Sequence, residues 1–161
     1  MSDEIFVGPA DLDDWTGLNE VRDRLEASKF SAYVSATRDE LRALLCNSIL
    51  LPHAVGLLVA RYRTIACGMA ALLLVQAPRP GTPGVATKPH GFIHSVYIDP
   101  SVAGMMIPPA VGAAVFAGIE KWSRDRGADY VYGNVRLDGH FDALYRKYGL
   151  VKQHYVIGKE L

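Results

Sequence analysis

The stretch that decides the fold is G-F-I-H-S-V-Y-I-D-P at residues 91–100, followed by S-V-A-G-M-M-I-P-P at 101–109 and an apolar run that ends in R-D-R-G at 124–127. The first ten residues are rich in β-branched and aromatic side chains, which predicts a strand. The following residues have the glycine and prolines of a loop, and either proline at its end suits the first turn of a helix. Gly127 suits the C-terminal cap of that helix. A strand, a loop and a helix in this order present backbone N–H groups to a phosphate-bearing cofactor.

The composition is that of an ordinary globular chain. Half of the 161 residues are hydrophobic and 21% are charged, so we expect a single domain spanning residues 1–161. Seventeen basic and seventeen acidic residues cancel, which gives no electrostatic signature of a nucleic-acid-binding protein. The N-terminal M-S-D-E-I-F-V lacks the basic and apolar regions of a signal peptide, and no uncharged apolar run reaches the length of a membrane-spanning helix. We therefore expect a cytoplasmic protein without a nucleic-acid or membrane partner.

The first half of the chain predicts one strand, two helices and a hairpin. A short strand over Glu4–Val7 is followed by Asp11, which suits the N-cap of an amphipathic helix. T-R-D-E at residues 37–40 matches a capping box at the start of a second helix. Two apolar runs, Ala54–Tyr62 and Ile65–Gln76, are separated by two residues and predict an antiparallel hairpin.

The second half predicts the parallel part of a mixed sheet. After a loop rich in proline and glycine, the elements expected in order are a strand over Gly91–Ile98, a helix over Pro108–Arg126, a strand over Asp129–Val135, a short helix over Gly139–Tyr148 and a last strand over Val151–Gly158. The whole order is β-α-α-β-β-β-α-β-α-β. A strand–helix–strand unit implies a parallel pair, and the hairpin implies antiparallel pairing beside it. The fold class is therefore α/β, with helices on both faces of a mixed sheet.

Two packing expectations follow from residue types. Cys46 and Cys67 have apolar neighbours in the sequence, so we expect both to be buried as small hydrophobic side chains. The helix after the loop is lined with small residues, which favours close packing on the sheet or, as a second interpretation, a flat face for a partner. These residues are Ala110, Gly112, Ala113, Ala114, Ala117 and Gly118.

The order of elements, with three particular stretches, resembles the GNAT acetyltransferase superfamily. The first is G-F-I-H-S-V-Y-I-D-P, the second E-K-W-S-R-D-R-G-A-D-Y at residues 120–130, and the third A-L-Y-R-K-Y-G-L at residues 143–150. In that family the central parallel strands splay apart at a bulge, and acetyl-coenzyme A lies in the gap. The resemblance implies a GNAT-like domain that binds acetyl-coenzyme A, with the backbone of Val96, Tyr97 and Ile98 along the pantetheine arm.

The family holds the cofactor pyrophosphate with backbone N–H groups of a loop of pattern R/Q-x-x-G-x-G/A. The resemblance places this role on Gly104, Met105, Met106 and Ile107, or, in a second register, on a longer loop that matches Gly112. In neither register is the basic residue present. Pro108 and Pro109 also lie in or beside the loop, where each removes a backbone donor. The departures predict weakened binding of acetyl-coenzyme A and leave open whether it binds.

Two residues are candidates for acid–base chemistry. His94 lies where similar sequences carry the base that deprotonates the acceptor amine, and histidine exchanges a proton near neutral pH. The alternative is a half-buried, hydrogen-bonded strand histidine. The resemblance assigns to Tyr145 the protonation of the leaving thiolate, alongside a simple packing role on its helix. Histidines and cysteines form no ligand pattern for a metal.

Two functions are therefore open at this stage. The first is an N-acetyltransferase that uses acetyl-coenzyme A and acts on a small-molecule or peptide amine. The second is a catalytically inactive protein of the same fold that serves a larger assembly, such as a phage-derived one. In that case a protein partner or a second copy would contact the apolar segment Val102–Val111.

Overall fold

The computed structural model describes residues 5–29, 31, 34–76, 88–99, 108–133 and 147. Its elements follow the predicted order as far as the described residues extend. The strand expected over 151–158 lies outside them, and of the helix expected over 139–148 only Lys147 is described, in helical conformation. In chain order the elements are β1 (Ile5–Pro9), the 3₁₀ helix η1 (Leu12–Asp14), α1 (Trp15–Glu26), α2 (Arg38–Leu50), β2 (Val55–Tyr62), β3 (Ile65–Val75), β4 (His90–Ile98), α3 (Pro108–Arg124) and β5 (Val131–Gly133).

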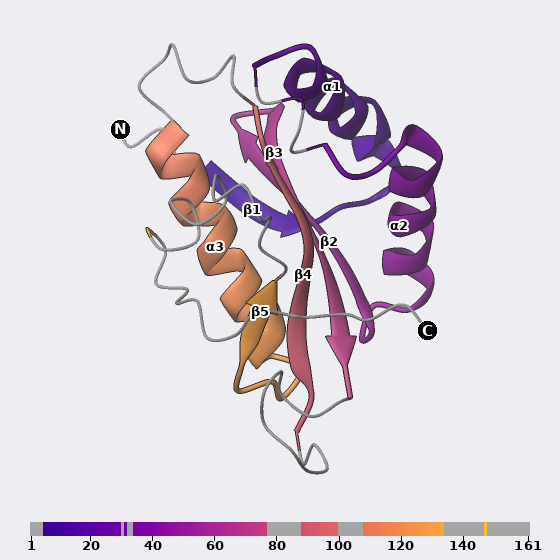
Figure 1. Ribbon diagram of the computed structural model, residues 1–161, viewed down its shortest axis with the longest axis vertical. Coiled ribbons are helices and arrows are strands. Elements are labelled where there is room, and N and C mark those ends of the chain that lie inside the picture. The colour runs from indigo at the N-terminus through magenta and orange to yellow at the C-terminus, as the bar shows by residue number, and fades with distance from the viewer. Residues whose placement is uncertain are drawn as a thin grey trace, which may run out of the picture.

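The strands of the described residues form one mixed sheet in the order β1-β2-β3-β4-β5. The first three pairings are antiparallel, and β4 pairs with β5 in parallel. The predicted hairpin is β2 and β3, and the predicted parallel pair is β4 and β5 joined through α3. Helices α1 and α2 cover one face of the sheet and α3 covers the other (Figure 1). The fold class and the two-faced arrangement are thus confirmed.

Local sequence signals account for where the helices begin and end. Asp11 and Asp14 form a capping box at η1, and Thr37 and Glu40 form one at α2. Each box satisfies backbone donors that have no partner inside the first turn. Gly127 has a φ of 79° and closes the turn after α3, a conformation that side chains with a Cβ rarely adopt.

Alternation along β2 divides the buried side chains between two cores. Leu57 and Val59 pack beneath α1 and α2, whereas Leu58 and Ala60 pack beneath α3. Because successive side chains of a strand point to opposite faces, one apolar run supplies both cores. The sheet is therefore buried on both sides at its centre.

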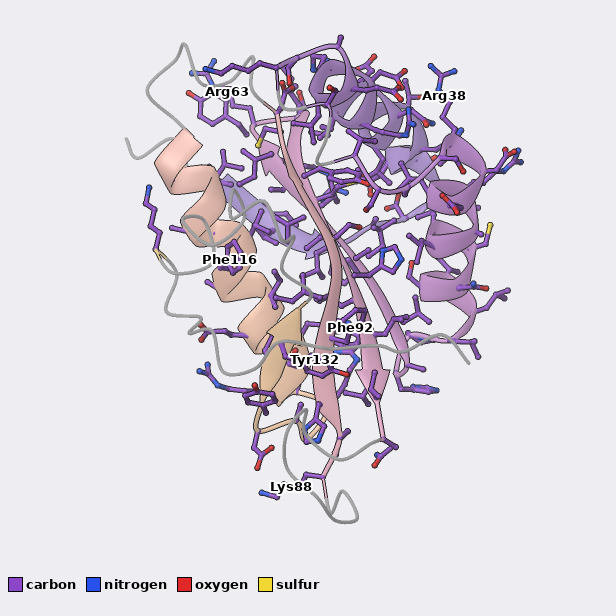
Figure 2. All side chains as sticks on the ribbon, in the orientation of Figure 1. Arg38, Arg63, Lys88, Phe92, Phe116 and Tyr132 are labelled. Atoms are coloured by element: carbon purple, nitrogen blue, oxygen red, sulfur yellow. The ribbon has the colours of Figure 1, made fainter. Side chains whose placement is uncertain are left out.

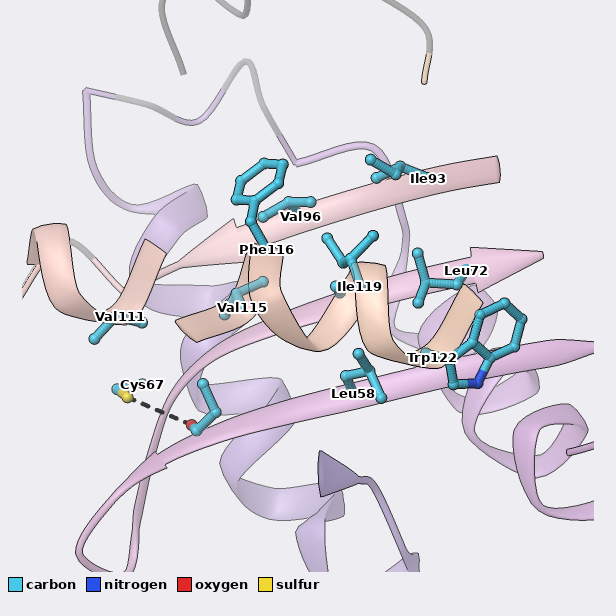
Figure 3. Close-up of a cluster of buried hydrophobic side chains, with 12 residues drawn as sticks. Leu58, Cys67, Leu72, Ile93, Val96, Val111, Val115, Phe116, Ile119 and Trp122 are labelled. Atoms are coloured by element: carbon cyan, nitrogen blue, oxygen red, sulfur yellow. Dashed lines mark hydrogen bonds between the residues drawn. The ribbon is translucent and has the colours of Figure 1, made fainter. Parts of the chain in front are cut away.

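Large side chains of α3, not its small ones, form its contact with the sheet. Val111, Val115, Phe116, Ile119 and Trp122 point into the core (Figure 3). Only part of the expected small-residue packing is present: Gly118 lies so close to β1 that an added Cβ would come within 2.8 Å of Val7. Three alanines instead lie on the solvent side of the helix, so close packing was the wrong explanation for them. They are Ala110, Ala113 and Ala117.

The cysteine expectation is half correct. Cys67 is fully buried on β3, and its Sγ donates to the carbonyl oxygen of Ala60 at 3.4 Å (Figure 3). Cys46 is exposed on α2, because its neighbours in sequence point to other sides of the helix. Across the described stretches, none of the helices has the length and apolarity needed to cross a membrane.

Candidate functional site

A β-bulge at His94 is the central feature of the site. Ser95 pairs with Ala71 of β3 and Ile93 pairs with Leu72, so one residue of β4 has no counterpart on β3. A bulge reverses the alternation of side chains beyond it. Ile93 and Val96 consequently both pack beneath α3, although they are three residues apart. The bulge matches the break that the GNAT resemblance implied for the central strands.

The bulge presents polar groups on the strand. His94 is exposed, and its Nδ1 lies 3.3 Å from Oγ of Ser95. The alternative of a half-buried strand histidine is therefore wrong about burial, although the hydrogen-bond contact exists. An exposed imidazole on a central strand has access to a solvent-borne substrate, which a general base needs.

The start of α2 carries a carboxylate in its capping box. Glu40 accepts a hydrogen bond from the backbone N–H of Thr37 at 2.7 Å. This bond lowers the pKa of Glu40, and a positive charge on His94 lowers it further.

Tyr97 lies on the face of the sheet beneath α1 and α2. Its side chain is 1% exposed, and its hydroxyl oxygen accepts hydrogen bonds from the backbone N–H groups of Ser35 and Ala36, each at 2.9 Å. The side chain is therefore a buried aromatic of the sheet. Its hydroxyl holds the chain just before α2, a role that the sequence did not indicate.

The pairing of β4 with β5 ends at the bulge. Their register runs from Gly91 with Val131 to Ile93 with Gly133, whereas β4 continues to pair with β3 as far as Ile98. Within the described residues, the edge of β4 from His94 onward has no strand on its β5 side. An extended ligand with amide groups fits such an edge, because it can pair with free backbone groups as an added strand does. This edge includes Val96, Tyr97 and Ile98, the residues expected beside the pantetheine arm.

A buried ion pair marks the end of β4. Asp99 is 1% exposed, and its Oδ2 accepts a hydrogen bond from Nε of Arg24 on α1 at 2.5 Å. Its backbone N–H donates to Cys67 on β3. The pair fixes the point at which the chain leaves the sheet toward the expected pyrophosphate loop.

The first turn of α3 offers few backbone donors. The first four N–H positions of a helix have no partner inside it, but Pro108 and Pro109 carry no N–H group. Ala110 and Val111 remain as donors. Gly112 is the fifth residue of the helix, within reach of the carbonyl four residues earlier, so its amide is suited to an internal bond. Four other predicted binding residues and the predicted acid lie outside the described residues: Gly104, Met105, Met106, Ile107 and Tyr145.

Aromatic side chains flank the parallel pair before the bulge. Phe92 and Tyr132 are direct partners on β4 and β5, and their ring centroids are 5.2 Å apart (Figure 2). Tyr130 stacks on Tyr132 at 5.9 Å. Burial raises the pKa of Tyr132, and a charge on Tyr130 raises it further. Tyr132 is thus a sheet aromatic held in its neutral form.

The sequence missed the contacts that converge on β4 from α1 and α2. A weak signal was present, because an acidic residue directly after a strand, as at Asp99, requires a partner if it is buried. The capping box at Thr37 and Glu40 was recognised, but nothing in the sequence places it on the same face of the sheet as the bulge. Both relationships depend on how the helices lie on the sheet.

Solved acetyltransferases have a similar fold. An aminoglycoside N-acetyltransferase in complex with coenzyme A is 13% identical and aligns with a TM-score of 0.74 over 98% of this chain and 95% of its own. Glucosamine-6-phosphate N-acetyltransferase from Arabidopsis thaliana is 13% identical, with a TM-score of 0.66 over 98% of each chain. A protein from Clostridium acetobutylicum described as a predicted acetyltransferase, in complex with acetyl-coenzyme A, is 18% identical, with a TM-score of 0.65 over 98% of this chain and 96% of its own.

No protein-family model matches the sequence, and no curated protein matches it significantly. The structural likeness, at identities of 13% to 18%, shows the fold and not the activity. The chain has the GNAT fold, and the resemblance found in its sequence is confirmed at that level.

Proposed function

We propose that this protein is an acetyl-coenzyme A-dependent N-acetyltransferase that acts on a small-molecule amine. The observation that carries the proposal is the bulge at His94, together with the edge of β4 beyond it, which has no strand on its β5 side among the described residues. It provides a backbone edge for an extended, amide-containing arm and places an exposed imidazole beside that edge. The fold alone would not suffice, because one fold supports many functions.

In this reaction the amine nitrogen bonds to the acetyl carbonyl carbon and the bond from that carbon to sulfur breaks. The ammonium form of the acceptor must first lose a proton, and we assign its acceptance to His94. Ser95 contacts the imidazole and orients it. The leaving thiolate gains a proton, for which Tyr145 is the proposed donor. Backbone groups of Val96, Tyr97 and Ile98 would hold the pantetheine arm.

The loop before α3 would bind the pyrophosphate of acetyl-coenzyme A more weakly than a loop with a basic residue would. We place the pyrophosphate near Gly104, Met105, Met106 and Ile107, where Ala110 and Val111 are the remaining donors of the first helical turn. Each charge-assisted hydrogen bond that is absent costs about 1.5–3 kcal/mol of binding free energy, or roughly ten- to a hundredfold in affinity. We expect dissociation constants for acetyl-coenzyme A above the micromolar range.

The names of two structurally similar proteins suggest which acceptor amines to test first. These two proteins are named for an aminoglycoside and for glucosamine 6-phosphate, both amine-bearing sugars. We propose amines of this size as the first panel, with a peptide amine and a polyamine as comparisons. Calorimetry with acetyl-coenzyme A up to millimolar concentration tests the first step, and chromatographic detection of acetylated amine tests the second.

His94→Gln should lower kcat about a hundredfold, the usual effect of losing a general base. His53→Gln is the matched control, because His53 is exposed in the turn before β2 and should be without effect. An absence of binding heat at millimolar acetyl-coenzyme A would overturn the proposal and favour the inactive, assembly-forming alternative.

A further inference from the structure

Tyr97 combines two properties that link β4 to the helices above it. It follows the bulge residues on the same strand, and it points to the face that α1 and α2 cover. Its ring belongs to the core formed with Leu18, Val21 and Leu41, so the ring itself is immobilised by packing. The hydroxyl group of this ring therefore has a fixed position relative to β4.

The hydrogen bonds of that hydroxyl are complete. A phenol oxygen has two lone pairs and one hydrogen, and it accepts from the N–H groups of Ser35 and Ala36. Its own hydrogen is then available to Oγ of Ser35, 3.2 Å away. Residues 34–37, here called the 34–37 segment, are therefore bound to β4 through side chain to backbone contacts.

The same segment is held from its other side. Nε of Arg22, a residue that is only 8% exposed, donates to the carbonyl oxygen of Ala36 at 2.7 Å. The capping box then fixes Thr37 against Glu40. Tertiary contacts consequently fix the positions of the N–H and carbonyl groups of Ala36. The position of the start of α2 follows from them. Connections between helices are ordinarily among the more variable parts of a fold.

The position of the 34–37 segment matters for the site at the bulge. The segment leads directly into α2, on the face of the sheet to which Tyr97 points. Ser95 of the bulge pairs with Ala71, which packs beneath the same helices, so the bulge lies on that face as well. An amine that approaches His94 from this face meets the 34–37 segment already held in place, and preformed geometry reduces the free energy needed to orient a reactant.

We propose that Tyr97 is a positioning residue, whose hydroxyl sets the 34–37 segment and the start of α2 against His94 and so shapes the acceptor side of the site. The acceptor role of Tyr97 rests on the proposed function. The hydrogen bonds of its hydroxyl are independent of that function. Tyr97→Phe removes only the hydroxyl. Tyr62→Phe, at the end of β2, is the same chemical change away from the segment and is the matched control.

Residue-resolved amide exchange is the first measurement. We expect the amides of Ser35 and Ala36 to exchange at least tenfold faster in Tyr97→Phe and to be unchanged in Tyr62→Phe. The second measurement uses saturating acetyl-coenzyme A, with glucosamine 6-phosphate or an aminoglycoside as acceptor. We expect the acceptor KM of Tyr97→Phe to rise at least fivefold, with kcat and the KM for acetyl-coenzyme A within twofold of wild type.

A second variant tests the same segment independently, in case Tyr97→Phe destabilises the fold. Arg22→Lys weakens the hold on the Ala36 carbonyl while leaving Tyr97 intact, and it should raise the acceptor KM in the same way. Unchanged exchange of the two amides in Tyr97→Phe would overturn the inference, as would an unchanged acceptor KM in both variants. Absence of turnover in the wild type would instead overturn the proposed function, and the acceptor role with it.

Discussion

Arg24 and Asp99 form an ion pair that joins α1 to the end of β4, with 2.5 Å between Nε and Oδ2. The carboxylate is 1% exposed, whereas the arginine side chain is 35% exposed. A buried carboxylate is tolerated when a cation and hydrogen bonds compensate for its lost hydration. The pair therefore ties the conformation of the strand end to the position of α1.

Arg24→Met should destabilise the protein by about 2–3 kcal/mol. Breaking a fully buried pair costs roughly 3–5 kcal/mol, and the solvent around Arg24 reduces that figure. Urea unfolding at pH 7 measures the effect. The double variant Arg24→Met with Asp99→Asn should recover part of the loss, because the unpaired charge is then removed. A single variant as stable as wild type would show that the pair does not anchor the strand.

Gly56 should not tolerate a side chain, because a Cβ there would lie 2.5 Å from Cε2 of Trp122. We expect Gly56→Ala to lower the unfolding free energy by about 1–3 kcal/mol through overpacking between β2 and α3. Thermal unfolding provides the measurement. Combining Gly56→Ala with Trp122→Phe should cost less than the sum of the two single changes, since the smaller ring leaves room. Strict additivity would contradict this contact.

The two cysteines should react very differently with a thiol reagent. Burial raises the pKa of the Cys67 thiol, so little thiolate forms, and the side chain is also shielded from the reagent. Cys46 is exposed on α2. We expect iodoacetamide at pH 8 to label Cys46 alone in the folded protein and both residues in urea. Cys46→Ser should abolish labelling of the folded protein, and residual labelling would show that β3 opens.

Asp23 and Arg38 join α1 to the start of α2, with 2.6 Å between Oδ2 and Nη2; Figure 2 labels Arg38 at the start of α2. Burial acts to raise the pKa of Asp23, but hydrogen bonds and charges from Arg38 and Arg22 outweigh it and lower the pKa. A carboxyl with a lowered pKa stabilises the fold above its unfolded-state pKa, and this contribution is lost as the pH falls through the folded-state value.

Arg38→Gln should therefore cost about 0.5 kcal/mol at pH 7, a typical value for an exposed pair. The difference from wild type should shrink as the pH falls below the unfolded-state pKa of about 4 and toward the lowered folded-state pKa of Asp23, because the carboxyl then loses its charge. Urea midpoints at pH 3, 5 and 7 follow this change. A difference that stays constant with pH would assign the effect to packing of the arginine stem.

The site was only partly accessible to prediction. His94 was identified because it lies where sequences similar to the GNAT superfamily carry a base, and the capping box before α2 was read directly from residues 37–40. Neither observation relates one to the other, since the start of α2 and the bulge share a face of the sheet only after α2 packs on it. The exposure of Cys46 was misjudged for a related reason: apolar neighbours in sequence do not lie on the same side of a helix.

The sequence by itself determined the order of elements, the starts of η1 and α2, the turn at Gly127 and the division of β2 between two cores. These features follow from periodicity, capping and backbone preference, which act over a few residues. Only the tertiary structure decided the bulge at His94, the hold of Tyr97 on Ser35 and Ala36, and the burial of Asp99 against Arg24. Those features depend on the register of β4 against β3 and on helices that meet the strand from distant parts of the chain.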